Sequence, residues 1–148
     1  MRRKSTDFNR VRHLSSTYSA RVKFNEVDSL GIVWHGHYIS YFEEGREAFG
    51  REYGISYLEI KNNHYTTPIV NVVCDYKKSL RYGETFTIIT YILDNLSAKI
   101  ILEYEIYNEN NELVCEGQTT QVFVDSDGVL ALYTPDFYQQ WRKKYIID

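Results

Sequence analysis

The sequence has 148 residues, the size of one domain with a single hydrophobic core. Hydrophobic residues make up 43% of it and charged residues 25%, a composition that excludes a disordered chain. The formal net charge of −3 excludes a global attraction for nucleic acid, so an anionic ligand requires a local basic patch.

Residues 1–16 are basic and show little periodic hydrophobicity. We interpret them as a solvated N-terminal arm, with binding of nucleic acid as the alternative, ahead of a single domain over 17–148. The arm lacks the apolar core of a signal peptide, and no run in the chain approaches the ~20 apolar residues of a membrane span. Cys74 and Cys115 lie in apolar strand patterns and are interpreted as free thiols. We therefore expect a cytoplasmic protein.

The first periodic segment predicts a strand over 17–26, with Tyr18, Ala20, Val22 and Phe24 on one face. After a short connection, apolar residues recur at helical spacing and predict a long helix that ends at about Tyr53. The apolar stripe of this helix consists of Tyr38, Tyr41, Phe42, Gly45, Ala48 and Phe49.

Three features refine the helical region. A glycine within a helix costs about 1 kcal/mol relative to alanine, so Gly45 on the apolar face indicates close approach to a sheet. Gly54 is placed to be the left-handed cap of the helix. Ser56 and Glu59 match a capping box and predict a short second helix.

From Thr66 onward the period is two. It predicts four antiparallel strands, at 67–76, 85–93, 99–107 and 113–125, with a hairpin at Asn110-Asn111. Pro135 then opens a terminal helix. One main helix against about five antiparallel strands is an α+β arrangement, and it leaves some sheet surface or edge for a partner.

The connection between the first strand and the long helix concentrates chemically useful groups. It contains Asp28, Gly31, His35, Gly36 and His37. The first N–H groups of a helix are unpaired and carry positive partial charge, so they can polarise a carbonyl oxygen beside an acid or base. We interpret this stretch as the active site.

The pattern Asp28-x-x-Gly31-x-x-x-His35-x-x-Tyr38, followed by Tyr41-Phe42-Glu43 and Arg46, resembles the 4-hydroxybenzoyl-CoA thioesterase family. The resemblance is to its bacterial acyl-CoA thioesterase branch, covers roughly residues 17–125, and implies the hotdog fold. It further implies a homodimer or homotetramer whose sites lie at subunit boundaries.

The resemblance also implies residue roles. Asp28 is the catalytic carboxylate, as nucleophile or general base, and the backbone N–H of His35 or a neighbour holds the carbonyl oxygen. The implied substrate-contacting residues are Gly31, Val33, Trp34, Tyr38 and Glu43. Two positions depart from the pattern: Phe24 replaces a tyrosine found in some relatives, and His37 replaces a common asparagine.

Each candidate residue also has a plainer interpretation. Asp28 could be a turn residue, and the His35 side chain could orient Asp28 or the substrate or contribute only its backbone amide. Glu43 and Arg46 are spaced as an intrahelical ion pair. The pair His35 and His37 with Asp28 is a weak metal motif, so we expect no metal or other cofactor.

A basic cluster follows the strand at 67–76. Lys77, Lys78 and Arg81 fit a solvated sheet edge, and their alternative role is to attract the phosphates of coenzyme A. We predict hydrolysis of an acyl-CoA, with a hotdog hydratase or dehydratase and a non-catalytic acyl-binding module as alternatives. Two questions stay open: which acyl group is cleaved, and whether its carrier is coenzyme A or an acyl carrier protein.

Overall fold

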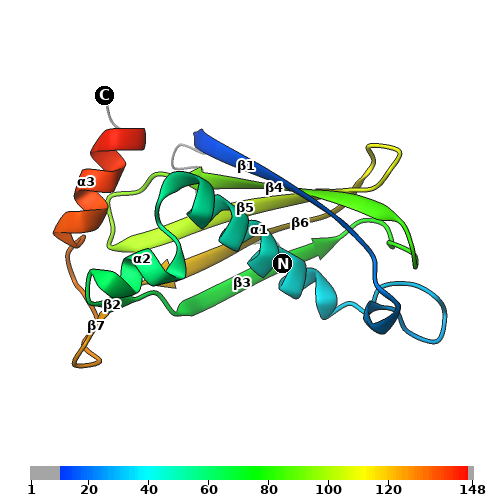
Figure 1. Cartoon of the computed structure of the whole chain (residues 1–148), viewed down its shortest axis with the longest axis horizontal. Helices are drawn as coiled ribbons and strands as arrows, with labels where there is room; N and C mark the ends of the chain where they lie inside the picture. The colour runs from blue at the N-terminus through cyan, green and yellow to red at the C-terminus, as the bar shows by residue number, and fades with distance from the viewer. Residues whose placement is uncertain (1–10, 147–148) are drawn as a thin grey trace, which may run out of the picture.

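The computed structural model describes residues 11–146 and shows an antiparallel sheet curved around one long helix (Figure 1). The elements in chain order are β1 (Arg12–Arg21), η1 (Phe24–Glu26), α1 (His37–Tyr53), α2 (Tyr57–Asn62), β2 (Tyr65–Thr66), β3 (Ile69–Tyr76), β4 (Thr85–Leu93), β5 (Lys99–Tyr107), β6 (Leu113–Val122), β7 (Val124–Asp125) and α3 (Asp136–Tyr145). The predicted strands at 85–93 and 99–107 are confirmed at both ends.

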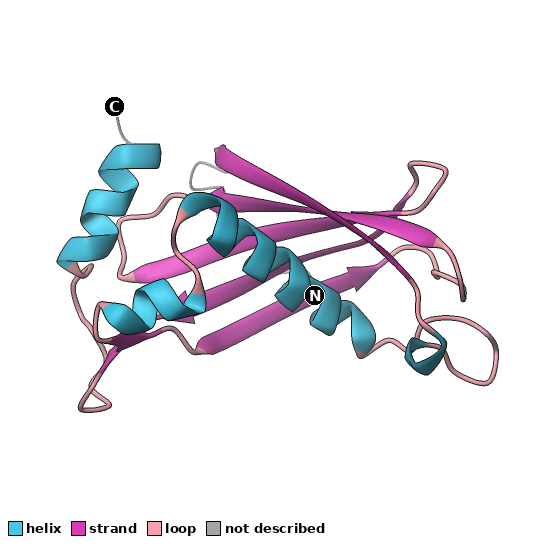
Figure 2. Cartoon of the chain, in the orientation of Figure 1, coloured by secondary structure: helices cyan, strands magenta, loops and turns pink. Residues whose placement is uncertain are grey.

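The five-stranded sheet has the order β1-β4-β5-β6-β3, and every neighbouring pair is antiparallel. Its helix-facing side is built from alternating residues that are fully buried, such as Ile88 and Ile92 in β4 and Ile106 in β5. β1 and β3 are the two edge strands. Figure 2 shows that α1 crosses one face of this sheet, so the predicted hotdog arrangement and α+β class are confirmed.

The predicted apolar stripe of α1 faces the sheet, and its aromatic residues are buried. The Phe42 ring stacks on the Tyr104 ring with centroids 4.6 Å apart. At Gly45 a β-carbon would lie 2.6 Å from Thr90 Oγ1. The helix and the sheet therefore approach closely at Gly45, as predicted. Gly54 has a left-handed φ of 73° and ends α1, as predicted. The capping box of Ser56 starts α2.

The start of the domain differs from the prediction. β1 begins at Arg12, so residues 12–16 are strand and the predicted arm boundary at 16 is wrong; residues 1–10 lie outside the described range. β1 pairs with β4 from Arg12 to Arg21. The backbone pairing of this edge strand needs no apolar alternation: the side chains of one face, such as Ser15 and Thr17, are exposed, and the other face includes the buried polar Ser16.

The predicted strand also runs too far at its other end. Phe24 lies in the 3-10 turn η1 with 78% of its surface exposed, and its ring meets the edge of Tyr82 at 5.9 Å. Val22 makes the last backbone hydrogen bonds of this segment: its N–H donates to the Glu84 carbonyl and its carbonyl accepts the Gly83 N–H, in the turn before β4. Beyond Val22 the chain leaves the sheet.

The predicted strand at 113–125 is divided. β6 ends at Val122, and β7 pairs with β2 in a separate two-stranded sheet. Phe123 between them is fully buried, and its carbonyl accepts a hydrogen bond of 2.8 Å from the N–H of Ala131. A buried aromatic anchor at this corner turns the chain from one sheet to the other.

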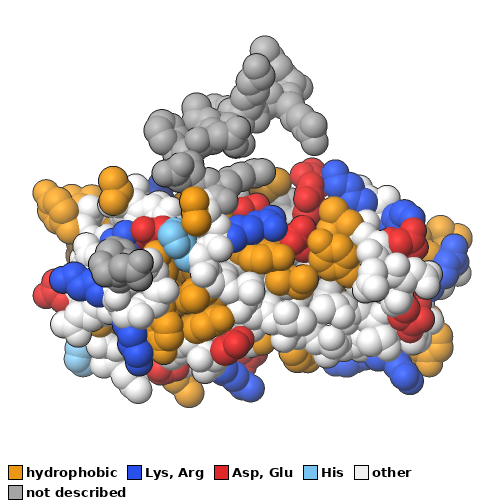
Figure 3. Space-filling view, turned by 90° about the horizontal axis from the view of Figure 1, so that it is seen from above, with side chains coloured by type: hydrophobic (Ala, Val, Ile, Leu, Met, Phe, Trp, Pro, Cys, Tyr) orange, Lys and Arg blue, Asp and Glu red, His pale blue; other side chains and the backbone are white. Residues whose placement is uncertain are grey.

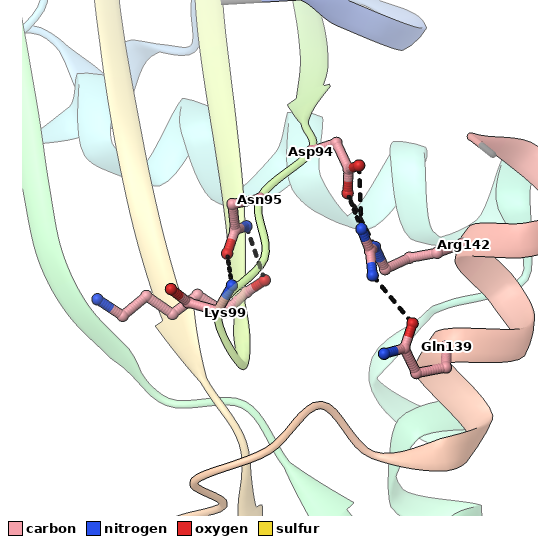
Figure 4. A network of polar contacts seen from close by, with 6 residues as sticks. Asp94, Asn95, Lys99, Gln139 and Arg142 are labelled. Carbon is pink, nitrogen blue, oxygen red and sulfur yellow. Dashed lines mark hydrogen bonds and ion pairs between the residues drawn. The ribbon is translucent and has the colours of Figure 1, made fainter. Parts of the chain in front are cut away.

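The terminal helix α3 follows Pro135, as predicted, and is held by a partly buried ion pair. Arg142 donates from Nε and Nη2 to the carboxylate of Asp94, at 2.8 and 3.0 Å, and from Nη1 to Gln139 (Figure 4). The Trp141 indole N–H donates to the carbonyl of Tyr53 at 2.7 Å. These contacts join α3 to the β4–β5 turn and to the end of α1.

Both cysteines are free thiols, as predicted. Cys115 is buried and Cys74 half-buried, and their sulfur atoms lie 3.4 Å apart. Among residues 11–146, no helix is long and apolar enough to cross a membrane.

Candidate active site

Asp28 is the first residue of a tight turn in the connection to α1. The N–H of Leu30 donates to Asp28 Oδ1 at 2.8 Å, and Gly31, with a left-handed φ of 76°, donates to the Asp28 carbonyl at 3.0 Å. Asp28 is thus a turn residue, as its plainer interpretation held. Its side chain is nevertheless exposed, and within residues 11–146 Oδ2 accepts no hydrogen bond. One carboxylate oxygen shapes the loop and the other is available for chemistry.

The loop that carries Asp28 is tied to the segment before β4. The Val33 N–H donates to the Leu80 carbonyl at 2.9 Å, and the Tyr82 N–H donates to the Gly31 carbonyl at 3.2 Å. Val33 itself is buried. These bonds fix the position of Asp28 relative to the start of α1.

The backbone at the start of α1 presents N–H groups that have no acceptor among residues 11–146. The Trp34 carbonyl accepts the His37 N–H at 2.9 Å, whereas the N–H groups of His35 and Gly36 donate to nothing within residues 11–146. In a planar trans peptide the N–H points opposite to the C=O. The His35 N–H therefore points away from the helix, with the positive end of the helix dipole behind it.

A cavity of about 290 Å³ lies between this loop and the end of β3. It is lined by Asp28, Ile32, Val33, His35, Tyr38, Tyr76, Lys77, Lys78 and Ser79. The structure thus brings the predicted catalytic pair together with two of the predicted lysines. The side chains of Asp28 and His35 share the cavity but make no hydrogen bond with each other.

Two tyrosines form one wall of the cavity. The Tyr38 hydroxyl accepts the Leu80 N–H at 3.1 Å, and burial raises the Tyr38 pKa. Its ring meets the edge of the Tyr76 ring at 5.3 Å, and the Tyr76 hydroxyl donates to the His35 carbonyl at 2.7 Å.

The sequence pattern placed Tyr76 only as the last residue of the predicted strand at 67–76 and did not indicate its place in the site. The one feature of the sequence that could have indicated it was the position of Tyr76 directly before Lys77 and Lys78, and this position does not indicate what the hydroxyl binds. A contact between residues 41 positions apart in the chain follows from how β3 and α1 pack.

Other predicted site residues lie outside the cavity lining. Gly31 shapes the loop, and Trp34 is half-exposed beside His35, with ring centroids 4.9 Å apart. Arg81 is exposed and its backbone bridges to Ile32. These three surround the cavity without lining it.

Glu43 is also separate from Asp28. It forms the predicted ion pair with Arg46, at 3.7 Å, and lines a different cavity of about 440 Å³ between α1, α2 and the sheet. Within this chain it has the plainer role that its spacing predicts.

The two cavity lysines each face a carboxylate. Lys77 lies 3.6 Å from Glu116, and Lys78 pairs with Glu112, whose pKa this hydrogen bond lowers. Exposed ion pairs are weak, so both lysines can turn toward a phosphate. On the face shown in Figure 3, charges of both signs are interspersed, which agrees with the small net charge.

The metal interpretation gains no support from the geometry of the chain between 11 and 146. No group of three or more His, Cys, Asp or Glu side chains there is placed to hold a metal ion. The rings of His35 and His37 both pack on Trp34, with centroids 4.9 and 5.5 Å from it.

Comparisons with known proteins agree with this geometry. Residues 22–141 match the thioesterase-like superfamily. The chain is 31% identical to YneP of Bacillus subtilis (strain 168), an inferred acyl-CoA thioesterase, over 84% of this chain and 90% of that one. The structure of a DHNA-CoA thioesterase from Staphylococcus aureus superposes with a TM-score of 0.78 and 26% identity, over 88% of this chain and 90% of that one.

A more distant structure shares the fold. A 4-hydroxybenzoyl-CoA thioesterase variant in complex with 4-hydroxybenzoyl-CoA superposes with a TM-score of 0.74 at 20% identity, over 86% of this chain and 97% of that one.

Proposed function

The chain belongs to the thioesterase-like superfamily, and from that membership and the site geometry we propose an acyl-CoA thioesterase of the 4-hydroxybenzoyl-CoA thioesterase family. A thioester hydrolase of this kind converts an acyl-CoA and water into a carboxylic acid and coenzyme A. The observation that supports this reaction best is the placing of the Asp28 carboxylate in one cavity with His35, whose N–H at the start of α1 has no acceptor in the described part of the chain.

Asp28 supplies the base or the nucleophile. Within residues 11–146 its Oδ2 accepts no hydrogen bond while Oδ1 is held by the Leu30 N–H, so the carboxylate has a fixed orientation. A carboxylate at neutral pH can attack a thioester carbonyl or remove a proton from water. The good leaving group of a thioester makes an activated serine unnecessary.

The developing oxyanion is stabilised by the helix terminus. The His35 N–H, directed away from α1, is the donor, because its own peptide plane is fixed by the bond from His37 N–H to the Trp34 carbonyl. The His35 side chain has a secondary role at the cavity wall.

The coenzyme A moiety meets the basic residues after β3. Lys77 and Lys78 line the cavity, and Arg81 lies in the segment that the active-site loop pairs with. Together they offer a local positive field to the phosphates in an otherwise acidic chain. The reaction needs no cofactor beyond the coenzyme A carried by the substrate. Two thiols in contact that remain reduced fit a cytoplasmic enzyme.

We propose that two copies pair through β3, in a homodimer or a homotetramer built from it. The outer edge of β3 pairs with no strand of residues 11–146, and its Val70, Val72 and Val73 are exposed. The other edge strand, β1, presents Ser15, Thr17 and other polar residues. An exposed apolar edge strand is a template for pairing with a second chain.

Light scattering tests the assembly. We expect at least twice the 17.5 kDa of one chain at micromolar concentration. Val73→Lys on the β3 edge should shift the protein toward the monomer, whereas Thr17→Lys on the β1 edge should not. A monomeric wild type, or equal effects of the two variants, would contradict the β3 pairing.

A panel of aliphatic and aromatic acyl-CoA substrates tests the function, with release of free thiol as the readout. Asp28→Asn keeps an Oδ1 acceptor for the Leu30 N–H, so the loop should hold its shape while hydrolysis falls to background. If the wild type hydrolyses none of these substrates, the proposed activity is wrong. Rates of Asp28→Asn within about tenfold of wild type, with an unchanged thermal midpoint, would sink only the role of Asp28.

A further inference from the structure

We propose that Tyr76 is a positioning residue for the oxyanion donor: its hydroxyl, donated to the His35 carbonyl at 2.7 Å, fixes the peptide that follows His35. The inference rests on the proposed function, because it concerns the same backbone N–H. It assigns a role in hydrolysis to a strand residue 41 positions away in the chain.

His35 lies between two peptide planes. The preceding plane is fixed when the Trp34 carbonyl accepts the His37 N–H at 2.9 Å. The following plane has no such backbone bond within residues 11–146, since the Gly36 N–H is unpaired and the His35 carbonyl accepts only the Tyr76 hydroxyl. The first plane carries the His35 N–H and sets its direction, and the second plane ties His35 to β3 and so sets where this donor residue lies relative to the cavity.

The backbone around this second plane has wide conformational freedom. The residue after it is glycine, which has the widest range of backbone conformations. Gly36 is the N-cap of α1 and receives no side-chain capping bond. A plane between a loop residue and a glycine needs an external anchor to keep one orientation, and Tyr76 is the anchor that the fold supplies.

Tyr76 is itself held in place. Tyr76 is the last residue of β3 and is paired with Cys115 of β6. Its ring meets the Tyr38 ring edge-on at 5.3 Å, and Tyr38 is buried under α1. Burial, with the neighbouring Cys74, raises the Tyr76 pKa to about 12, so the hydroxyl keeps its proton and remains a donor at neutral pH.

The test compares two tyrosines that make the same kind of bond. Tyr53 donates to the Ser15 carbonyl at 2.6 Å, at the far end of α1. With the acyl-CoA that the wild type hydrolyses best, Tyr76→Phe should lower kcat by about 5–20-fold, less than loss of a whole oxyanion donor. KM and the Kd for free coenzyme A should stay within about twofold, because the oxyanion exists only in the transition state. Tyr53→Phe should leave kcat unchanged.

A second variant separates the hydroxyl from the ring. Tyr76→Leu also removes the packing on Tyr38, and it should lose no more kcat than Tyr76→Phe when both are assayed well below their thermal midpoints. The proposal is overturned if Tyr76→Phe retains wild-type kcat, if only Tyr76→Leu loses it, or if kcat, KM and coenzyme A affinity change together. A Tyr76→Phe chain that does not fold also overturns it, because the bond would then serve the fold. An inactive wild type refutes the proposed function instead.

Discussion

The indole ring of Trp34 lies against Gly36 so closely that a β-carbon at position 36 would fall 2.2 Å from Cζ3 of the ring. Gly36 has an ordinary helical φ of −70°, so space and not backbone conformation requires glycine here. The ring is 49% exposed and packs on His35 and His37 on either side. Trp34 and Gly36 therefore set the shape of the helix start that the proposed oxyanion site uses.

Gly36→Ala should damage activity more than stability. The added methyl pushes away either the Trp34 ring or the peptide next to His35, so kcat should fall by about tenfold or more. Because the displaced ring can move into solvent, the free energy of unfolding should change by less than about 1 kcal/mol. Steady-state kinetics and urea denaturation check both values.

Gly45→Ala is the matched control for this prediction. A β-carbon there would lie 2.6 Å from Thr90 Oγ1 and 2.9 Å from Ile88 Cγ2, both in the core. Overpacking costs about 1–3 kcal/mol, while kcat of the folded fraction should be retained. If Gly36→Ala loses stability and keeps its kcat, the proposed importance of the helix start is wrong.

His35→Ala should retain turnover at about one tenth to one hundredth of the wild-type rate, because the backbone N–H remains. The side chain makes no hydrogen bond with Asp28, and it lines only one wall of the cavity. His37→Ala, which removes the other imidazole packed on Trp34, should have a smaller effect. A His35→Ala enzyme as inactive as Asp28→Asn would show that the imidazole takes part in the chemistry.

Replacing Lys77 and Lys78 together by alanine should raise KM for acyl-CoA by about 3–10-fold and leave kcat unchanged, with a smaller effect at high salt. The matching control replaces Lys143 and Lys144 in α3, outside the cavity. An acyl-pantetheine thioester has no nucleotide phosphates, so its KM should be the same for both variants and wild type. An equal rise of KM for both substrates would contradict a phosphate-binding role.

Stability should fall as pH rises above about 10, the ordinary pKa of tyrosine. Burial raises the pKa of Tyr104 to about 12, in spite of its hydrogen bond with Thr119. A folded-state pKa above the unfolded one contributes stability that is complete below pH 10 and is lost between about 10 and 12. Urea midpoints measured from pH 8 to 11, with tyrosinate absorbance, check this.

Tyr104→Phe should reduce the steepness of that alkaline loss, whereas Tyr82→Phe should not, because Tyr82 is exposed. The two variants therefore separate a buried phenol from a surface one. An identical pH dependence in both would show that Tyr104 is not among the groups that destabilise the fold at high pH.

The sequence by itself determined two inner strands of the sheet and the long helix. The strands at 85–93 and 99–107 alternate between a buried and a half-exposed face, so period two marks both ends. Gly54 and the Ser56 capping box act within a few residues of chain, and such local signals depend little on the rest of the fold. The short motif around Asp28 and His35 also located the cavity.

Tertiary structure decided what depends on contacts distant in the chain. β1 starts at Arg12 because β4 is there to pair with it, and the polar residues of an edge strand carry no periodic signal. The role of Tyr76 likewise depends on a contact distant in the chain, because its hydroxyl meets the His35 carbonyl only after β3 and α1 pack. Tertiary structure also separated Glu43 from Asp28, since the intervening positions 29–42 form the loop before α1 and the first residues of that helix rather than a single turn.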